Sequence, residues 1–189
     1  MPQFQGKTKI IFIFHTIWIN SVMKKLFLVR HAKSSWDDPS LDDIDRPLND
    51  RGKNNAPEMG ERLKKQGILP DLLISSPASR ARSTAKKLAK KIGYAKNEIQ
   101  INDGLYHGSD DILIDIVRNL PDTAESVMLF GHNPGFTYFA NQLCNINIYN
   151  IPTAGVVAID FPMDSWQDVE FGKGELVFFD YPKKQPNKT

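Results

Sequence analysis

"LFLVRHAKSSWDD", at residues 26–38, places an arginine and a histidine directly after a short apolar run. Leu26–Val29 has the composition of a strand that is buried on both faces. Arg30 and His31 add nothing to a hydrophobic core, and an unpaired arginine is costly to bury. Either the strand ends in a turn that happens to be polar, or an anion binds where the strand ends.

Two further apolar runs are followed by polar residues in the same way. The runs are residues 71–75 ("DLLIS") and 127–130 ("VMLF"), and each precedes a segment with helical spacing. The polar residues are Ser76 and Arg80 after the first run, and His132 and Asn133 after the second.

Four helices are predicted from spacing and end signals. The helix after residue 75 has Ser76 as its N-cap and stops at Gly93, and the helix after residue 130 is capped by Asn133. A helix over residues 49–67 contains Pro57, which should kink or restart it. A fourth helix covers residues 109–121.

The alternation of strands and helices decides the fold class. Short buried strands that alternate with helices form a mostly parallel sheet covered on both faces, a three-layer α/β/α architecture. Residues 155–161 and 174–181 are β-like runs joined by a polar segment, so antiparallel strands are expected near the C-terminus.

Composition narrows the class of protein. A chain of 189 residues with 41% hydrophobic content fits one domain, and a net charge of +2 is too small for a nucleic-acid-binding protein. Cys144 is the single cysteine and there are four histidines, so no internal disulfide and no metal-ligand cluster is expected. A reducing, cytoplasmic location is the expectation.

The first 22 residues stand apart from the rest. Two lysines precede an apolar run over residues 10–19, which is too short to span a bilayer. The segment is either a poor signal peptide without a cleavage site, or an extension upstream of Met23 or a loosely attached strand, and we favour the second interpretation. We therefore expect an extension at residues 1–22, one domain at residues 23–183 and a polar tail at residues 184–189, with no membrane association.

The three strand ends should meet in one place. Ligands bind beyond the carboxyl ends of the strands in such sheets, so Arg30, His31, Arg80 and His132 are expected to converge there with two helix amino ends. Arginine forks match phosphate oxygens, and the expected occupant is a phosphoryl group. Taken singly, each feature also has a purely structural explanation.

Three motifs carry a resemblance to a known family. In order, "LVRHAKS", "SSPASRARSTA" and "GHNPGF" resemble the histidine phosphatase superfamily, whose members are phosphoglycerate-mutase-like. The short length, "DRPLNDRGKNNA", "GLYHGS" and the C-terminal stretch are most similar to bacterial phosphohistidine phosphatases of the SixA type. The similarity covers about residues 24–183.

The resemblance implies a role for each motif residue. His31 is the nucleophile, which takes the phosphoryl group onto its ring and then yields it to water. Arg30 and Arg80 hold the phosphoryl oxygens, and His132 adds a second imidazole. Asn133 is interpreted first as a helix cap and second as a phosphate ligand. With this density of cations, neither a metal ion nor a cofactor is expected.

A general acid is harder to assign. Asp103 stands nearest to the place where phosphoglycerate-mutase-like relatives carry a glutamate, but it is also a typical residue for a turn before Gly104. An imidazole leaving group departs more readily than an alkoxide, so a missing acid fits a phosphohistidine substrate.

The resemblance leaves the substrate open. No long insertion builds a cover over the site, so the site is open to a phosphorylated protein, such as a phosphotransfer domain, or to a small phosphate ester. The protein is expected to be a monomer. A phosphatase acting on protein phosphohistidine is the first prediction. The alternatives are a broad-specificity phosphomonoesterase on the same scaffold and a phosphoanion-binding module without catalysis.

Overall fold

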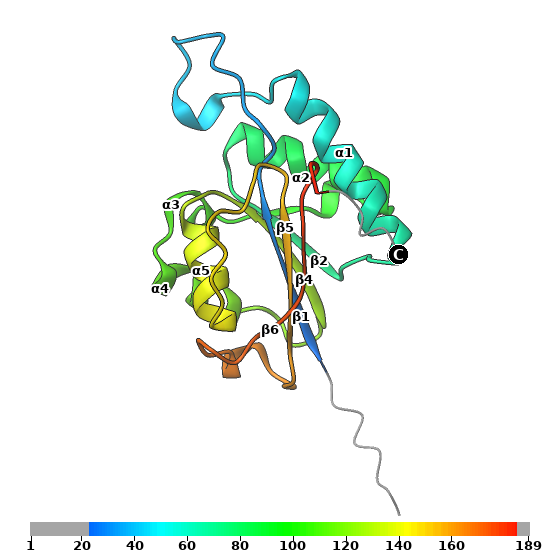
Figure 1. Cartoon of the computed structure of the whole chain (residues 1–189), viewed down its shortest axis with the longest axis vertical. Helices are drawn as coiled ribbons and strands as arrows, with labels where there is room; N and C mark the ends of the chain where they lie inside the picture. The colour runs from blue at the N-terminus through cyan, green and yellow to red at the C-terminus, as the bar shows by residue number, and fades with distance from the viewer. Residues whose placement is uncertain (1–22, 185–189) are drawn as a thin grey trace, which may run out of the picture.

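The computed structural model describes residues 23–184, and within them a six-stranded sheet forms the centre of the fold (Figure 1). The strand order is β3-β2-β4-β1-β5-β6. The strands are β1 (Lys24–Arg30), β2 (Leu72–Ser75), β3 (Gln100–Ile101), β4 (Ser126–Gly131), β5 (Val156–Phe161) and β6 (Glu175–Asp180). The N-terminal extension and residues 185–189 of the tail lie outside the described residues.

The sheet is parallel on one side and antiparallel on the other. β1 pairs with β4, β4 with β2 and β2 with β3 in parallel, whereas β5 pairs antiparallel with β1 and β6 antiparallel with β5. The mostly parallel sheet and the antiparallel addition near the C-terminus confirm the predicted fold class. The two-residue strand β3 was not predicted.

Helices cover both faces of the sheet (Figure 1). They are α1 (Asp50–Lys65), α2 (Ser79–Ile92), α3 (Gly104–His107), α4 (Asp110–Arg118) and α5 (Gly135–Cys144), with 3-10 turns η1 (Asp43–Asp45), η2 (Lys96–Glu98) and η3 (Trp166–Asp168). Alternate strand residues enter two apolar clusters: Leu26 and Leu28 share one with α4 and α5, and Phe27 and Val29 share the other with α1 and α2. The architecture is therefore three-layered.

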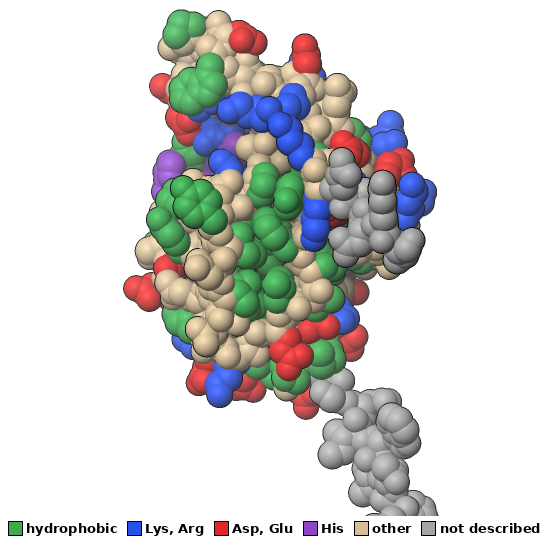
Figure 2. All heavy atoms as spheres, in the orientation of Figure 1, with side chains coloured by type: hydrophobic (Ala, Val, Ile, Leu, Met, Phe, Trp, Pro, Cys, Tyr) green, Lys and Arg blue, Asp and Glu red, His purple; other side chains and the backbone are tan. Residues whose placement is uncertain are grey.

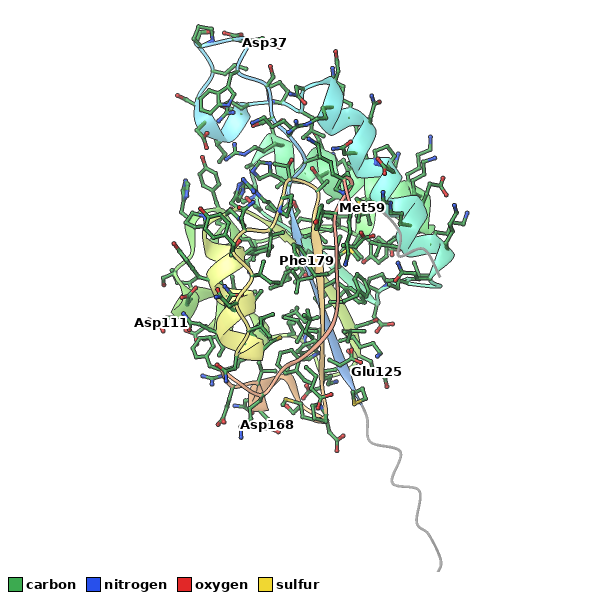
Figure 3. The ribbon with its side chains drawn as sticks, in the orientation of Figure 1. Asp37, Met59, Asp111, Glu125, Asp168 and Phe179 are labelled. Carbon is green, nitrogen blue, oxygen red and sulfur yellow. The ribbon has the colours of Figure 1, made fainter. Side chains whose placement is uncertain are left out.

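The helix ends agree with the sequence in part. Asn49 caps α1 by accepting a hydrogen bond from the Gly52 amide. Gly93 ends α2 in the left-handed conformation, as predicted. The expectation that Pro57 restarts a helix was wrong, because α1 runs unbroken through it. In Figure 3, Met59 lies on the side of α1 that faces the sheet, whereas Asp111 points outward from α4.

The surface divides into two regions on the face shown in Figure 2. Lysine and arginine side chains gather near the loop that follows β1, with histidine beside them, and hydrophobic side chains gather over β5 and β6. Leu176 and Val177 of β6 are among the exposed hydrophobic residues. None of the helices within residues 23–184 has the length and apolar character needed to cross a membrane.

A close backbone approach joins α1 to the loop after β1. The Asn49 amide donates to the Lys33 carbonyl over 3.0 Å, and a Cβ on Gly52 would lie 2.2 Å from that carbonyl oxygen. Glycine at position 52 therefore lets the first turn of α1 touch the backbone two residues after His31.

We predict that Gly52→Ala destabilises the protein by about 1–3 kcal/mol, since the added methyl collides with rigid backbone. Urea unfolding measures this change. Gly135→Ala is the control, because a Cβ there has its nearest neighbour at 3.5 Å and alanine favours the helix by roughly 0.5–1 kcal/mol. Equal stability of the two variants would contradict the packing argument.

Candidate active site

The carboxyl ends of β1, β2 and β4 meet at one edge of the sheet. In the parallel register Arg30 pairs with Gly131, and Ser75 pairs with Phe130. The His31 amide donates to the Gly131 carbonyl over 3.0 Å, and the Ser76 amide donates to the Phe130 carbonyl over 2.9 Å. The three strand-to-helix junctions therefore start from neighbouring backbone positions.

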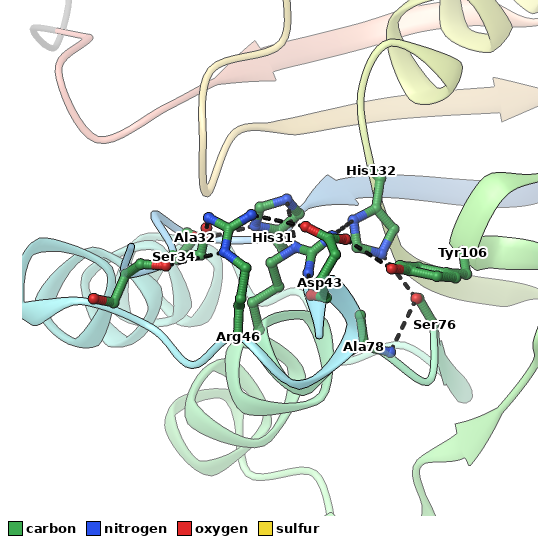
Figure 4. Close-up of polar contacts among 11 residues, drawn as sticks. His31, Ala32, Ser34, Asp43, Arg46, Ser76, Ala78, Tyr106 and His132 are labelled. Carbon is green, nitrogen blue, oxygen red and sulfur yellow. Dashed lines mark hydrogen bonds and ion pairs between the residues drawn. The ribbon is translucent and has the colours of Figure 1, made fainter. Parts of the chain in front are cut away.

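Three of the predicted site residues contact one another (Figure 4). The Arg80 guanidinium lies 3.4 Å from His31, Nε to Nε2, and 3.4 Å from His132, Nη2 to Nδ1. The ring centroids of His31 and His132 are 4.8 Å apart. Arg80 is buried, whereas the two imidazoles are half-buried. A buried cation thus lies between two imidazole rings.

The hydrogen bonds determine the tautomer of each imidazole. His31 Nδ1 lies 2.7 Å from the Ala32 carbonyl oxygen, which can only accept, so the proton is on Nδ1 and the lone pair is on Nε2. Arg80 can only donate, so His132 Nδ1 accepts from it and His132 Nε2 carries the proton. That proton points to the Ser76 hydroxyl oxygen at 2.8 Å.

Both imidazoles are neutral at physiological pH. Burial lowers the pKa of His31 to about 4; the hydrogen bond to Ala32 opposes this shift, and the charges of Arg80, Arg30 and Arg46 add to it. Burial also lowers the pKa of His132 to about 3, with His31 and Arg80 as further causes. A neutral imidazole with one unprotonated ring nitrogen is the nucleophilic form of histidine.

Arg30 and Asn133 are joined through the loop before β5. Arg30 Nη1 donates to the Ile151 carbonyl over 2.6 Å and to Asn150 Oδ1 over 3.3 Å, and Asn133 Nδ2 donates to the same two oxygens over 3.1 and 2.9 Å. Arg30 Nε and Asn133 Oδ1 are buried and have no hydrogen-bond partner within residues 23–184. Arg30 therefore keeps one donor that none of these residues accepts from, and phosphate binding by Arg30 stays a prediction.

Both predicted caps at the site were wrong. α5 has Pro134 at its N-cap position, because the Asn133 side chain is turned toward Asn150 and Ile151. α2 begins at Ser79 with Ala78 at the N-cap, and the Ser76 hydroxyl bonds His132 while it accepts weakly from the Ala78 amide over 3.3 Å. Phosphate binding by Asn133 stays a prediction.

Sequence reasoning missed Asp43, which pairs with Arg80, and the two side chains that bond Asp43, Tyr106 and Arg46 (Figure 4). Asp43 Oδ2 accepts from Arg80 Nη2 over 2.8 Å and from the Tyr106 hydroxyl over 2.7 Å, and Asp43 Oδ1 accepts from Arg46 Nη1 over 2.8 Å. Asp43 comes from an aspartate-rich loop with no regular pattern, so no signal marked it. Tyr106 lies in "GLYHGS", which was noted for its resemblance alone.

Asp103 and His107 take no part in the hydrogen bonds that connect Asp43 and Arg80. The Asp103 carboxylate is exposed and makes no hydrogen bond or ion pair with any residue from 23 to 184. His107 lies 3.8 Å from Tyr106 and 6.5 Å from His132, centroid to centroid. A cavity of about 320 Å³ is lined by Tyr106, His107 and His132. The space beside His132 is thus aromatic, and Asp103 as an acid stays a prediction.

Comparison with known proteins identifies the family. A family model for the histidine phosphatase superfamily (branch 1) matches residues 26–107. An uncharacterized chloroplastic protein of Arabidopsis thaliana is 31% identical over 157 residues, which cover 78% of this chain and 71% of that protein. The chain belongs to the histidine phosphatase superfamily.

Solved structures extend the likeness across the described fold. The proposed phosphohistidine phosphatase SixA of Agrobacterium tumefaciens is 27% identical, with a TM-score of 0.70 over 84% of this chain and 98% of that one. The protein histidine phosphatase SixA in complex with tungstate shares the fold, with a TM-score of 0.72, 20% identity and coverage of 84% and 97%. Within residues 23–184 of this superfamily member, no three His, Cys, Asp or Glu side chains are grouped to hold a metal.

We predict that the two imidazoles protonate near pH 4 (His31) and pH 3 (His132), as followed by NMR of the ring signals. Both folded pKa values lie below the ordinary 6.5, so the unfolded chain binds more protons in this window. Stability should therefore fall as the pH falls from about 6.5 through about 4. The His31→Asn, His132→Asn double variant should lose this part of the pH dependence. If urea unfolding shows that its unfolding free energy changes with pH as much as that of wild type, the prediction is refuted.

Proposed function

We propose that the protein is a phosphatase that hydrolyses protein phosphohistidine through a phosphoryl group carried on His31. The observation that supports this most directly is the state of His31. Its Nδ1 proton is bound by the Ala32 carbonyl, and its Nε2 lone pair lies 3.4 Å from the Arg80 guanidinium. A neutral, oriented imidazole beside a cation is suited to attack a phosphoryl group.

The first step transfers the phosphoryl group to the enzyme. The Nε2 lone pair forms a bond to phosphorus while the bond from phosphorus to the substrate nitrogen breaks, and that electron pair leaves with the substrate imidazole. Arg80 and Arg30 match the charge of the phosphoryl oxygens during transfer. The substrate reacts in the form in which its other ring nitrogen carries a proton, so the imidazole that leaves is neutral.

The second step returns the enzyme to its starting state. Water attacks phosphorus, the bond between phosphorus and Nε2 breaks, and the lone pair returns to His31. The water proton is carried off by the phosphate that is released or by solvent. A bound dianion favours protonation of His132, which turns its Nδ1 from an acceptor into a donor for a phosphoryl oxygen. No step uses a metal ion.

The ionised carboxylate of Asp43 favours a substrate with a nitrogen leaving group. Tyr106, Arg80 and Arg46 bond the Asp43 carboxylate, and despite the opposing effect of its partial burial its pKa stays well below the usual range. Asp43 is therefore ionised and has no proton to give to an alkoxide. A phosphohistidine, whose imidazole leaves without help from a carboxylic acid, suits this site better than an alkyl phosphate.

A small phosphomonoester is the second candidate substrate. The cavity of about 320 Å³ beside His132 falls within the size range of small-molecule sites, roughly 300–1,000 Å³. Its lining includes Leu105, Phe136 and Tyr138, so an aryl group would find apolar contacts there. This observation favours an aryl phosphate over a sugar phosphate.

His31→Ala should reduce turnover of p-nitrophenyl phosphate by about a thousandfold or more, since no nucleophile remains. The wild-type protein, but not this variant, should form an acid-labile phosphoprotein from acetyl phosphate. Arg80→Ala should lose about a hundredfold, whereas Arg82→Ala, at an exposed position of the same helix, should keep its activity. Normal turnover by His31→Ala would refute the nucleophile assignment.

The substrate is tested by direct comparison. In the presence of EDTA, kcat/KM for a phosphotransfer domain that carries phosphohistidine should exceed that for sugar phosphates by roughly tenfold or more. The measurement is release of inorganic phosphate by wild type, with His31→Ala as the blank. A preference for sugar phosphates would overturn the substrate assignment, and loss of turnover in EDTA would overturn the metal-free mechanism.

A further inference from the structure

The Arg80 guanidinium has two edges with different partners. On its outer edge Nη1 donates to the Asp43 backbone carbonyl, and Nη2 donates to the Asp43 carboxylate over 2.8 Å. On its inner edge Nε and Nη2 face His31 and His132 at 3.4 Å each. Contacts of 3.4 Å are long for hydrogen bonds, so the inner edge is held weakly and the outer edge strongly.

Asp43 is itself fixed by its neighbours (Figure 4). The Tyr106 hydroxyl donates to Oδ2 and Arg46 donates to Oδ1. Arg46 is buried and also donates to the Ser34 hydroxyl over 2.8 Å and to the Ser35 carbonyl over 3.1 Å. The carboxylate thus has few ways to move relative to the strand end that carries His31.

The position of Asp43 shows whether its carboxylate orients Arg80 or occupies the place of a phosphoryl oxygen. If the carboxylate occupied the place of a phosphoryl oxygen, it would lie on the inner edge of Arg80, between the imidazoles. It lies on the outer edge, where it leaves Nε and Nη2 directed at His31 Nε2 and His132 Nδ1. A phosphoryl oxygen at the inner edge replaces the two long contacts and leaves the Asp43 contacts in place.

We propose that Asp43 is a positioning residue, which holds the outer edge of Arg80 so that the inner edge presents its donors to the phosphoryl group attacked by His31. This inference rests on the proposed function. A carboxylate that orients an arginine resembles the carboxylates that orient ligating histidines in metal sites, whose loss costs 10–100-fold in affinity or activity. Because the carboxylate also neutralises the buried Arg80, its removal leaves a less well compensated charge.

The first test compares three variants of the η1 turn. Asp43→Ala should lower kcat/KM for p-nitrophenyl phosphate by about 10–100-fold and should weaken inhibition by inorganic phosphate. Asp43→Asn keeps one acceptor oxygen, so its kcat/KM should fall less than that of Asp43→Ala. Asp45→Ala is the matched control, because Asp45 is exposed in the same turn and its carboxylate bonds no residue in the described part of the chain, so its kcat/KM should stay near that of wild type.

A higher kcat/KM or tighter phosphate binding in Asp43→Ala would overturn the inference. If Asp43 competed with phosphate for Arg80, Asp43→Ala would bind phosphate more tightly and raise kcat/KM. Equal effects of Asp43→Ala and Asp45→Ala would show that general charge, not orientation, is responsible. In an Arg80→Ala background, Asp43→Ala should have little further effect, since there is then no guanidinium to orient. Circular dichroism and thermal unfolding confirm that each variant is folded.

A readout without catalysis separates this inference from the proposed function. In ¹⁵N NMR, the Arg80 Nε–H signal should exchange with water about tenfold faster or more in Asp43→Ala than in wild type and Asp45→Ala, because the guanidinium is no longer held. Unchanged exchange would refute the positioning role. An inactive wild-type protein with this exchange pattern would refute the proposed function and leave the orientation of Arg80 by Asp43 established.

Discussion

The parallel, in-register pairing of β1, β4 and β2 is the constraint on which the site depends. It brings Arg30 beside Gly131 and Ser75 beside Phe130, so three junctions far apart in the chain begin at one sheet edge. A slip of one residue would turn each strand's side chains to the opposite face. The two apolar clusters, one on each face, hold the register because alternate residues of every strand must be buried on a particular side.

Hydrogen bonds also fix the position of His31 relative to Arg80. The Ala32 amide donates to the Thr84 hydroxyl over 2.9 Å, and that hydroxyl donates to the Arg80 carbonyl over 2.7 Å. The residue after His31 is therefore tied to the helix turn that carries Arg80. Since a buried amide without a partner is costly, this link stabilises the separation between His31 and Arg80. The core and the site are supported by the same contacts.

How far the site could be predicted depends on where each residue lies. His31, Arg80 and His132 follow buried strands directly or within one helical turn, and strand ends in such a sheet have known neighbours. Asp43 and Tyr106 come from a loop and a short helix, where a sequence pattern does not specify direction. The caps were misassigned for a related reason: Ser76 and Asn133 have side chains that suit a cap, but His132 and Ile151 offered them other partners.

The sequence by itself determined five of the six strands, the four longer helices and the set of cations and imidazoles at one edge, because hydrophobic periodicity and end signals act over a few residues. The short elements β3 and α3 have too few residues for such a pattern. Only the tertiary structure decided how those groups are connected. The tautomers of His31 and His132, their lowered pKa values and the hold of Asp43 on Arg80 all depend on burial and on contacts between distant segments. Such contacts follow from the packed fold and leave no local pattern in the chain.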